Sequence, residues 1–414
     1  MKFTLNSYYI ETYGCAANQA DSAIMEGILR NSKYKKTSFK QSEFIIVNTC
    51  AVKQATENKI RARLKELYEF SQTHPNKKII ITGCLPLISS NYIDKIKKII
   101  PTFSAIVDLN SIIQISDVLN RIKMGEDNLV ITSDVKIDKS HYLINHATEK
   151  LTATIPISEG CIGACSYCCV KNARGDLNCY KPDSIIETAK HYLQQGIKQI
   201  YLTSQDCSIY EYDSTQLADL LRKIQNLPYD FLLRLGMINP RFLHQNLDQI
   251  IEILSFDKVY QFIHLPIQSG SSRVLRKMNR PYKISDIIGK IATLREKFPY
   301  LTISTDIICG FPAETEYDFY KTINFTKWLQ PEILNISQFT PRPGTKAKKM
   351  EQLKSEVIKE RSTRLSKVFW SSLDFLNDKW KGWEGRILVL HPGDEDNQAF
   401  GRNFAYKNVF LNDY

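Results

Sequence analysis

The sequence predicts an α/β fold in three parts, and two series of short apolar segments are the main reason. Residues 1–130 alternate apolar segments with longer amphipathic ones, and residues 147–350 do the same. Such alternation is typical of strands and helices in parallel sheets. The first series predicts an open parallel α/β sheet, and the second a parallel barrel or part of one. Residues 351–414 predict an amphipathic helix and a short β-rich tail.

Composition and charge are those of an ordinary globular protein. The 414 residues, 43% hydrophobic and 24% charged, exceed what one hydrophobic core usually organises. No apolar run reaches the length of a membrane span and no signal peptide opens the chain, so we expect a cytoplasmic protein without a membrane partner. The net charge of +11 suits a polyanion such as nucleic acid, although a merely basic surface would give the same value.

A cysteine follows each of the first three predicted strands. The strands of this part are predicted at residues 8–12, 44–48, 78–82 and 105–108. Ligands gather at the carboxyl ends of strands in open α/β sheets, so Cys15, Cys50 and Cys84 should meet in space. Three unrelated buried cysteines are the alternative. The repeated junction favours three ligands of one iron–sulfur cluster, which fits ten cysteines in a reducing compartment.

Two polar features complete the first part of the chain. Asn18 and Asp21 follow Cys15 closely and are candidates to cap the helix after the first loop, and a purely structural role is the alternative. Residues 125–147 are more polar than their surroundings, which predicts a linker between two domains.

The second series predicts six further strands, at residues 152–157, 198–203, 230–235, 259–265, 301–308 and 332–338. Active sites of parallel barrels lie at the carboxyl ends of the strands. Polar segments stand at those ends: Ser204-Gln205-Asp206, Arg234 to Met237, His264 to Gly270, Asp306 to Pro312 and Arg342 to Thr345. We therefore expect an active site at this end of the barrel.

Three cysteines with the spacing Cys-x-x-x-Cys-x-x-Cys follow the first of these strands. Cys161, Cys165 and Cys168 share one short glycine-containing loop, and soft sulfur ligands at this spacing favour an iron–sulfur cluster. Three ligands leave one iron of a four-iron cluster open, and an open coordination site is where chemistry occurs. A zinc knuckle would need Cys169 as a fourth ligand, and a disulfide cluster does not suit a long chain without an export signal.

The residues around these cysteines carry a family resemblance. The signature of radical S-adenosylmethionine (SAM) enzymes, specifically of the methylthiotransferases, is similar to Glu159-Gly160-Cys161 through Cys168 and to Ala173-Arg174-Gly175. The resemblance implies an open partial barrel of six units in which Cys161, Cys165 and Cys168 hold the catalytic cluster. It also implies that SAM binds the free iron through its amino and carboxylate groups, and that an electron cleaves SAM to a 5′-deoxyadenosyl radical.

The first part resembles the N-terminal domain of the same family, which carries an auxiliary cluster. The matching segments are Thr12 to Asn18 with Asp21-Ser22, Asn48 to Lys53, and Gly83-Cys84. The resemblance implies that Cys15, Cys50 and Cys84 are metal ligands. The protein would then hold two [4Fe-4S] clusters.

Contacts to SAM follow from its polar groups and from the same resemblance. Gln205, Asp206, Arg234 and Gln268 are the predicted donors and acceptors for the ribose, adenine and amino-acid groups. The backbone beside Tyr167 is predicted to meet the adenine. We expect His264 to be a structural residue and not a base.

RNA contacts are predicted from basic residues and from the tail. One basic group comprises Arg273, Arg276, Lys277, Arg280 and Lys283, and another Lys346, Lys348 and Lys349. Phosphate contacts and a solvated helix face explain such groups equally well. Gly401-Arg402-Asn403 and Tyr406 to Val409 resemble the start of a TRAM domain, a small RNA-binding β-barrel that would be shortened here.

Three segments resemble one branch of the family, the archaeal and eukaryotic threonylcarbamoyladenosine enzymes: Asn48 to Lys53, Arg234 to Pro240, and Gln338 to Thr345 with Lys349 to Gln352. The resemblance implies methylthiolation of C2 of N6-threonylcarbamoyladenosine at tRNA position 37, in an anticodon loop that presents the base unpaired. Two molecules of SAM would be consumed per turnover.

Other functions stay open on the sequence. Isopentenyladenosine in tRNA and an aspartate of a ribosomal protein are the alternative substrates, and a non-catalytic iron–sulfur RNA-binding protein is the alternative class. Three ligands at each cysteine site argue against that last class. We expect a monomer that uses an electron-donor protein and a sulfur source which the sequence does not identify.

Overall fold

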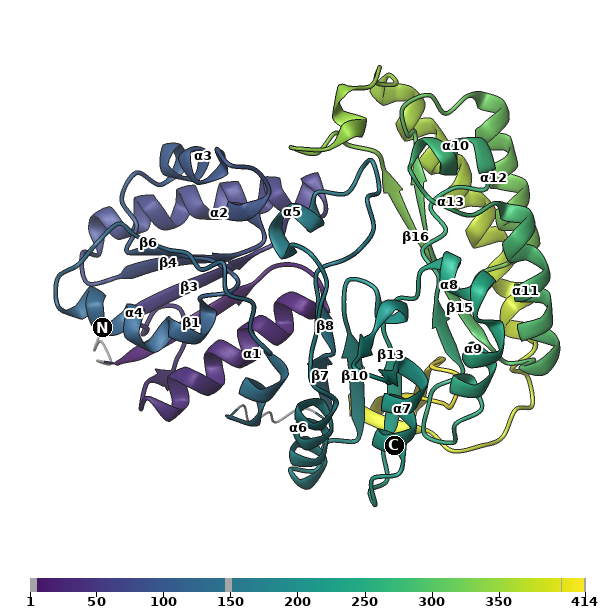
Figure 1. The fold of residues 1–414 in the computed structure, drawn as a ribbon, viewed down its shortest axis with the longest axis horizontal. Coiled ribbons are helices and arrows are strands. Elements are labelled where there is room, and N and C mark those ends of the chain that lie inside the picture. The colour runs from purple at the N-terminus through teal and green to yellow at the C-terminus, as the bar shows by residue number, and fades with distance from the viewer. Residues whose placement is uncertain (1–5, 146–150, 396, 413–414) are drawn as a thin grey trace.

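The computed structural model describes residues 6–145, 151–395 and 397–412, which form two α/β bodies side by side and a small C-terminal sheet (Figure 1). The predicted start of the second domain at residue 147 lies outside the described residues. Within these ranges, no helix has the length and apolar character needed to cross a membrane.

The first body is a six-stranded parallel sheet with the strand order β2-β1-β3-β4-β5-β6. Its strands are β1 (Ser7–Thr12), β2 (Lys35–Lys36), β3 (Phe44–Thr49), β4 (Lys78–Gly83), β5 (Ala105–Val107) and β6 (Leu129–Ile131). Its helices are α1 (Ala16–Asn31), α2 (Gln54–Thr73), α3 (Tyr92–Ile99) and α4 (Ile115–Lys123), with short helices η1 (Leu85–Leu87), η2 (Ile112–Gln114) and η3 (Ser140–Asn145). The four strands predicted here are confirmed.

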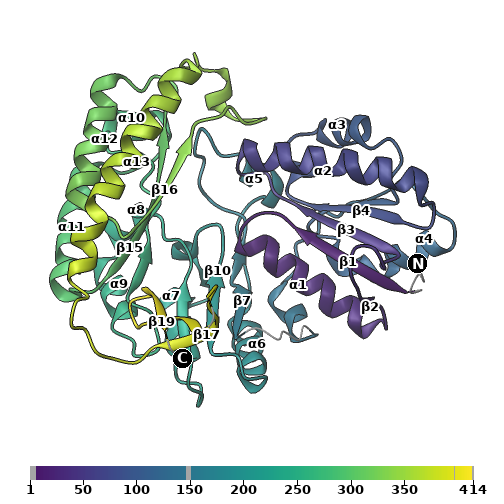
Figure 2. The ribbon, with the colours of Figure 1, turned by 180° about the vertical axis from the view of Figure 1, so that it is seen from behind.

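Helices cover both faces of this sheet, which explains why strand β3 begins with four apolar residues in a row, Phe44 to Val47. In β3, Phe44 and Ile46 belong to one core with α1, while Ile45 and Val47 belong to another core with α2. Successive side chains of a strand point to opposite faces, so a strand buried on both faces needs a continuous apolar run. Figure 2 shows α1 and α2 on opposite sides of β3.

The predicted linker over residues 125–147 is wrong in part. Strand β6 lies inside it and pairs in parallel with β5, with Val130 opposite Ile106. Its burial is only partial, and Val130 is exposed, because β6 is the edge strand of the sheet. Three apolar residues between polar neighbours gave too weak a pattern to predict it.

The second body contains the six predicted strands in sequence order: β7 (Thr152–Pro156), β10 (Gln199–Thr203), β13 (Leu232–Leu235), β14 (Phe262–His264), β15 (Thr302–Cys309) and β16 (Ile333–Gln338). They form two parallel sheets, β13-β10-β7 and β14-β15-β16, joined by parallel bridges such as Met237 with His264. Strands β7 and β16 are not paired with each other among the described residues, so the barrel is open between them.

Helices follow the barrel strands: α6 (Pro182–Gln194), α7 (Leu217–Gln225), α8 (Pro240–Gln245), α9 (Leu247–Leu254), α10 (Ser272–Lys277), α11 (Ile284–Lys297), α12 (Glu316–Leu329) and α13 (Ser355–Asp378). Shorter elements lie between them: β8 (Ser158–Glu159), α5 (Val170–Arg174), β9 (Asn178–Cys179), η4 (Cys207–Ile209), β11 (Glu211–Tyr212), β12 (Thr215–Gln216) and η5 (Lys346–Lys349). One hydrophobic core includes Ile24 of α1 and Ile155 of β7, so the two bodies are packed together.

The C-terminal tail is an antiparallel sheet of β17 (Leu388–Pro392), β18 (Gln398–Arg402) and β19 (Asn408–Asn412). It is held against the barrel through the turn between β18 and β19. The Tyr406 ring lies 4.7 Å from the Phe262 ring and 5.0 Å from the Tyr260 ring, centroid to centroid. The predicted β-rich tail is therefore present, and it packs on the barrel strands.

Candidate active site

Strand register brings the three N-terminal cysteines to one edge of the first sheet. Asn48 of β3 pairs with Thr12 of β1 on one side and with Thr82 of β4 on the other, so the three strands end level. The cysteines that follow these ends form what we call the N-terminal thiol site: Cys15, Cys50 and Cys84.

Asn18 of α1 lies at the centre of this site. Its Oδ1 is 3.5 Å from Cys15 Sγ and 4.0 Å from Cys84 Sγ, and its Nδ2 donates to Thr49 O at 2.9 Å. The prediction that Asn18 caps α1 is therefore wrong: Cys15 is the N-cap residue, and no side chain caps the helix there. The amide joins the helix to the strand ends instead.

Gly14 allows the backbone after β1 to pass close to the Cys50 side chain. A Cβ atom at this position would lie 2.8 Å from Cys50 Cβ and 3.0 Å from Cys50 Sγ, and the backbone has φ +121°. Only glycine adopts this conformation without strain, and any side chain would fill the space beside the thiol. The absence of a side chain at Gly14 thus leaves space beside the Cys50 thiol, which a methyl group would fill.

Burial makes two of these thiols poor acids without a metal. It raises the pKa of Cys50 and raises that of Cys84 to about 12. Both groups are therefore protonated at neutral pH, and iron would have to displace their protons to bind the thiolates.

The second set of cysteines, the loop thiol site, follows β8. Cys161, Cys165 and Cys168 are each partly buried. The Gly163 amide donates to Cys161 Sγ at 3.2 Å, and Arg280 Nη1 donates to Cys165 Sγ at 3.6 Å. Burial raises the pKa of Cys168 to about 11. A backbone amide and a guanidinium thus face the sulfurs, and both favour negative charge on a bound thiolate.

A segment of the barrel fixes the conformation of this loop. The backbone amide of Ser166 donates to Met278 O at 2.9 Å, and Asn279 Nδ2 donates to Ala164 O at 2.8 Å. Arg280 Nη2 also donates to Pro266 O at 2.6 Å, which orients the guanidinium toward Cys165. The turn after α10 therefore supports the loop thiol site from behind.

These contacts correct part of the predicted phosphate-binding group. Arg280 is buried against the loop thiol site, and Arg273 forms an ion pair with the buried carboxylate of Asp318. The Arg280 guanidinium is therefore not available to phosphate, whereas the Arg273 side chain, although paired with Asp318, is still 44% exposed. For the remaining exposed residues, such as Arg276 and Lys277, phosphate contact stays a prediction.

Four buried charges connect the two thiol sites, and we call them the charge ring: Asp21, Lys139, Glu159 and Arg174. Arg174 bonds to Asp21 Oδ2 and Glu159 Oε1, both at 2.6 Å. Lys139 Nζ lies 3.3 Å from Asp21 Oδ1 and 2.8 Å from Glu159 Oε1. All four side chains are at most 4% exposed.

The charge ring explains several residues of the sequence motifs. Asp21 belongs to α1 and does not cap it, while Glu159 stands two residues before Cys161. Burial alone would raise the pKa of Glu159, but Lys139 and Arg174 lower it to about 2. Removing one member would leave the opposite charge buried and unpaired, which is strongly destabilising. The ring therefore fixes the helix of one thiol site to the loop of the other.

Arg342 makes a second connection between the bodies, beside Cys50. Its guanidinium forms an ion pair with Glu57 at 2.7 Å and donates to Ala51 O at 2.8 Å. Cys169 Sγ donates to the same carbonyl at 3.3 Å. The residue after Cys50 is therefore held from the barrel side.

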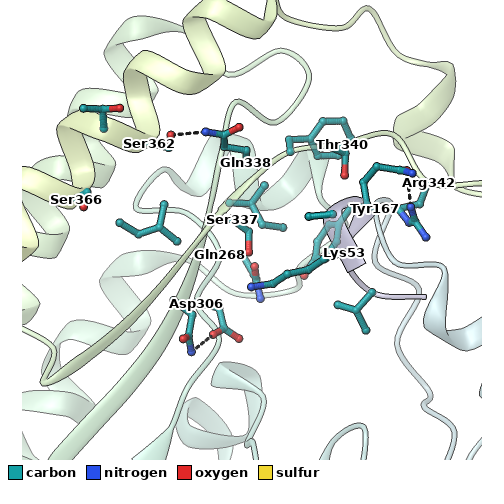
Figure 3. A pocket seen from close by; sticks show the side chains of 18 of the residues that line it. Lys53, Tyr167, Gln268, Asp306, Ser337, Gln338, Thr340, Arg342, Ser362 and Ser366 are labelled. Carbon is teal, nitrogen blue, oxygen red and sulfur yellow. Dashed lines mark hydrogen bonds between the residues drawn. The ribbon is translucent and has the colours of Figure 1, made fainter. Parts of the chain in front are cut away.

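A cavity of about 1200 Å³ is lined by residues that neighbour both thiol sites in the chain (Figure 3). Val52 and Lys53, which follow Cys50, line one side, and Tyr167, which precedes Cys168, lines another. Gln268 and Asp306 lie at its floor in Figure 3, with Lys53 extended toward them. The outer walls are residues of β16, of the segment just after it and of α13: Asn335, Ser337, Gln338, Thr340, Ser362, Thr363, Ser366, Lys367 and Trp370.

The residues predicted to contact SAM are not all in this cavity. Tyr167 and Gln268 line it. Gln205 Oε1 accepts a bond of 2.7 Å from the Gly160 amide, and Asp206 Oδ1 accepts one of 3.1 Å from the Ser208 amide. Burial raises the pKa of Asp206. Gln205 therefore supports the loop thiol site, and a SAM contact by any of these four residues stays a prediction.

Arg234 stands apart from the other predicted residues. Its guanidinium carbon lies 4.7 Å from the Phe262 ring, 5.1 Å from the Tyr201 ring and 5.2 Å from the Tyr406 ring. Burial lowers its pKa, and its Nε has no hydrogen-bond partner among the described residues. Arg234 does not line the cavity, and its role toward SAM stays a prediction.

His264 contacts a carboxylate of the cavity, and its structural role stays a prediction. Its Nε2 is 3.2 Å from Asp306 Oδ2, while Asn335 Nδ2 donates to Asp306 Oδ1 at 2.8 Å. Burial alone would raise the pKa of Asp306, but His264 and Asn335 lower it. The pair thus orients a carboxylate at the floor of the cavity.

Several residues of the site could not be found from the sequence. Lys139 and Arg280 looked like ordinary surface cations, because their buried partners are distant in the chain. The polar residues of α13 formed a regular helical stripe, but nothing showed that the stripe faces a cavity.

The spacing of the candidate ligands distinguishes a single metal ion from an iron–sulfur cluster. Among the residues that the structure describes, no three His, Cys, Asp or Glu side chains are close enough to hold a single metal ion. A four-iron cluster does not require this, since its thiolates bind different iron atoms. The soft donor sets, the space at Gly14 and the donors facing the sulfurs fit such a cluster at both sites.

Known proteins resemble both bodies. Residues 7–107 match Uncharacterized protein family UPF0004, and residues 155–326 match the Radical SAM superfamily. A Pyrococcus horikoshii protein named "Probable threonylcarbamoyladenosine tRNA methylthiotransferase" is 37% identical over 97% of this chain and 93% of its own length. The Homo sapiens "Threonylcarbamoyladenosine tRNA methylthiotransferase" is 34% identical over 98% of this chain and 69% of its own length.

Solved structures with a similar fold are radical SAM enzymes of low sequence identity. The radical SAM methyltransferase TsrM of Kitasatospora setae has a TM-score of 0.58 and 13% identity, over 82% of this chain and 74% of its own. This likeness concerns the fold alone. It extends over both α/β bodies.

Proposed function

Because the chain belongs to the radical SAM methylthiotransferase family, in its threonylcarbamoyladenosine tRNA branch, we propose that it acts on the modified adenosine at position 37 of a tRNA anticodon loop. The protein is a radical SAM tRNA methylthiotransferase. It adds a methylthio group to C2 of N6-threonylcarbamoyladenosine.

The position of the cavity is the observation that carries this proposal. Lys53 stands three residues after Cys50, and Tyr167 stands between Cys165 and Cys168, and both line the same space. A nucleoside bound there is beside both thiol sites at once. Radical formation at one site and sulfur delivery at the other require such an arrangement.

SAM and a [4Fe-4S] cluster are the cofactors of the superfamily, and when bound they supply the radical that removes hydrogen from an unactivated carbon. We propose that Cys161, Cys165 and Cys168 hold this cluster, and that Cys15, Cys50 and Cys84 hold a second one. Arg280 then stabilises the thiolate of Cys165, and the charge ring holds the two sets of ligands at a fixed separation.

The lining of the cavity favours threonylcarbamoyladenosine over isopentenyladenosine. Its outer walls carry hydroxyl and amide groups of β16 and α13, and two ammonium groups, Lys53 and Lys367, also line it. A threonylcarbamoyl group offers a carboxylate, a hydroxyl and amide groups to these side chains. An isopentenyl group would leave them unpaired, and a site built for hydrogen bonds rejects a substrate that cannot make them.

Mass spectrometry of nucleosides tests the proposal. Reconstituted protein is incubated anaerobically with SAM, sulfide, a reductant and one of three anticodon stem-loops, whose target adenosine is unmodified, isopentenylated or threonylcarbamoylated. We expect the methylthio product only from the threonylcarbamoylated RNA. Product from the isopentenylated RNA at an equal rate would contradict the substrate assignment, while 5′-deoxyadenosine without any RNA product would point to a substrate outside RNA.

A further inference from the structure

The cavity has an outer wall that the chemistry at the thiol sites leaves unexplained. Helix α13 contributes one stripe of this wall, at the helical spacing Thr363, Ser366, Lys367 and Trp370. The opposite side of the helix is buried: Leu365 packs against Ile307 and Phe319 in a separate small core. The stripe therefore faces the cavity because the rest of α13 is fixed to the barrel.

The barrel holds this helix firmly at its cavity side as well. Gln338 Nε2 of β16 donates to Ser362 Oγ at 2.8 Å, as Figure 3 shows. Arg361 forms an ion pair of 2.8 Å with Glu314 and is only 5% exposed on its side chain. The stripe is thus a rigid surface, and a rigid surface binds a partner at a low cost in ordering.

Trp370 is the most unusual member of the stripe. It lines the cavity, yet 64% of its surface is exposed, so it lies at the mouth. Among the described residues, its indole makes one ring contact, with Phe369 at 5.6 Å between centroids. A large exposed aromatic side chain at the mouth of a cavity is typical of surfaces that stack nucleic-acid bases.

The covalent structure of RNA explains why a second surface is needed. A target nucleoside in the cavity remains joined to its neighbours, so the strand must leave through the mouth. The bases next to the target are single-stranded in an anticodon loop and lose their stacking partner when the target enters the cavity. Lys367, one turn of helix before Trp370, is exposed and supplies positive charge at the same mouth.

We propose that the cavity stripe of α13 is an RNA-binding surface, on which Trp370 stacks a base next to the target adenosine and Lys367 contacts the adjoining phosphate. This inference rests on the proposed function, because it takes RNA as the substrate. It assigns RNA contacts to the helix before the tail, in addition to any made by the tail itself.

Binding of a threonylcarbamoylated anticodon stem-loop by wild type and variants tests the inference. Fluorescence anisotropy measures the dissociation constant, and tryptophan fluorescence reports stacking. Trp370→Ala should weaken binding about tenfold, since one base–aromatic stack contributes that much, whereas Trp370→Phe should stay within about threefold. Lys367→Ala should weaken binding and reduce the slope of log affinity against log salt by about 0.7.

Phe375 provides a matched control on the same helix. It is 67% exposed, close to the 64% of Trp370, but it does not line the cavity. Phe375→Ala should leave RNA affinity unchanged. Circular dichroism and iron content establish that each variant is folded and loaded.

The outcomes separate the inference from the proposed function. If Trp370→Ala binds and modifies the RNA like wild type, or if Phe375→Ala weakens binding equally, the stacking surface is wrong and the proposed function stands. If RNA quenches the fluorescence of Trp370→Phe as much as that of wild type, the indole is not stacked. If wild type neither binds nor modifies the RNA, the proposed function and the inference fail together.

Discussion

The chain builds its two thiol sites in different ways. The N-terminal thiol site takes one cysteine from each of three neighbouring strand ends, so the register of a parallel sheet positions its sulfurs. The loop thiol site takes all three from eight consecutive residues, and contacts from the turn after α10 hold that loop. At the N-terminal thiol site Cys50 and Cys84 are buried and Cys15 is exposed, whereas the three loop cysteines are all partly buried.

This difference suggests a division of labour between a site fixed by a sheet and a site on a loop. A site made from strand ends is rigid, and two of its three sulfurs are buried, which suits holding a reactive sulfur species in a fixed position. A site on a supported loop keeps an open side toward the cavity, which suits a cluster that must bind a second molecule. The charge ring and Arg342 are two separate connections between the sites. A substitution can therefore break one connection without removing a cysteine ligand.

Cys165→Ala should have the largest effect, because it removes a ligand from the loop thiol site. We expect the formation of 5′-deoxyadenosine to fall below detection, together with the methylthio product. Chromatography of the nucleosides released from SAM measures this. Cleavage at the wild-type rate in this variant would exclude Cys165 as a ligand of the catalytic cluster.

Cys50→Ala should separate the two sites from each other. Because the loop thiol site is intact in this variant, SAM cleavage to 5′-deoxyadenosine should continue while the methylthio product is lost. The two products are quantified in the same reaction. A variant that still forms methylthio product at more than about a tenth of the wild-type rate would contradict the role of the N-terminal thiol site.

Arg174→Met should uncouple the sites without removing a ligand. It leaves the carboxylates of Asp21 and Glu159 with Lys139 alone, so we expect the free energy of unfolding to fall by about 3–5 kcal/mol. Beyond this loss, the ratio of methylthio product to 5′-deoxyadenosine should drop about tenfold, because the separation of the sites is no longer fixed.

Arg295→Met is the matched control for the charge ring. It breaks another arginine–carboxylate pair, with the mostly buried Glu332, and neither residue of this pair lines the cavity. It should cost some stability and leave the product ratio unchanged. Equal ratios in the Arg174 and Arg295 variants would mean that the charge ring has a structural role only. If Arg174→Met does not fold, Arg174→Lys, which keeps the charge but not the geometry, replaces it in the comparison.

The smallest effects are expected at the four cysteines outside both sites: Cys169, Cys179, Cys207 and Cys309. Replacement of each by serine should leave the iron content near that of wild type. Three of the four are buried, so a modest loss of thermal stability is the expected cost. Loss of one cluster's iron in any of these variants would mean that a ligand has been misassigned.

The sequence predicted what depends on local pattern and missed what depends on distant pairing. All six barrel strands and the junctions at Cys15, Cys50 and Cys84 follow from apolar segments and their ends. By contrast, Asp21 and Arg174 are 153 residues apart, and nothing local marks them as partners. Asn18 was expected to cap α1 for the same reason: its bond to Thr49 exists only after the sheet has formed.

Residue types alone also could not show which basic residues are exposed to solvent. Arg280 stands among exposed basic residues in the sequence, but the folded chain buries it beside the thiol loop, while Arg273 pairs with a buried aspartate and stays 44% exposed. The cavity stripe of α13 was not foreseen, since a polar helix face normally meets water. Only the position of β16 and of the Cys50 loop turns that face into a wall.

Iron content of three proteins tests the central claim most directly, namely that each thiol site holds its own four-iron cluster. The three are wild type, a variant with Cys15, Cys50 and Cys84 replaced by alanine, and one with Cys161, Cys165 and Cys168 replaced. After anaerobic reconstitution we predict about eight iron atoms per chain in wild type and about four in each variant. About four in wild type, with no loss in the first variant, would contradict the claim.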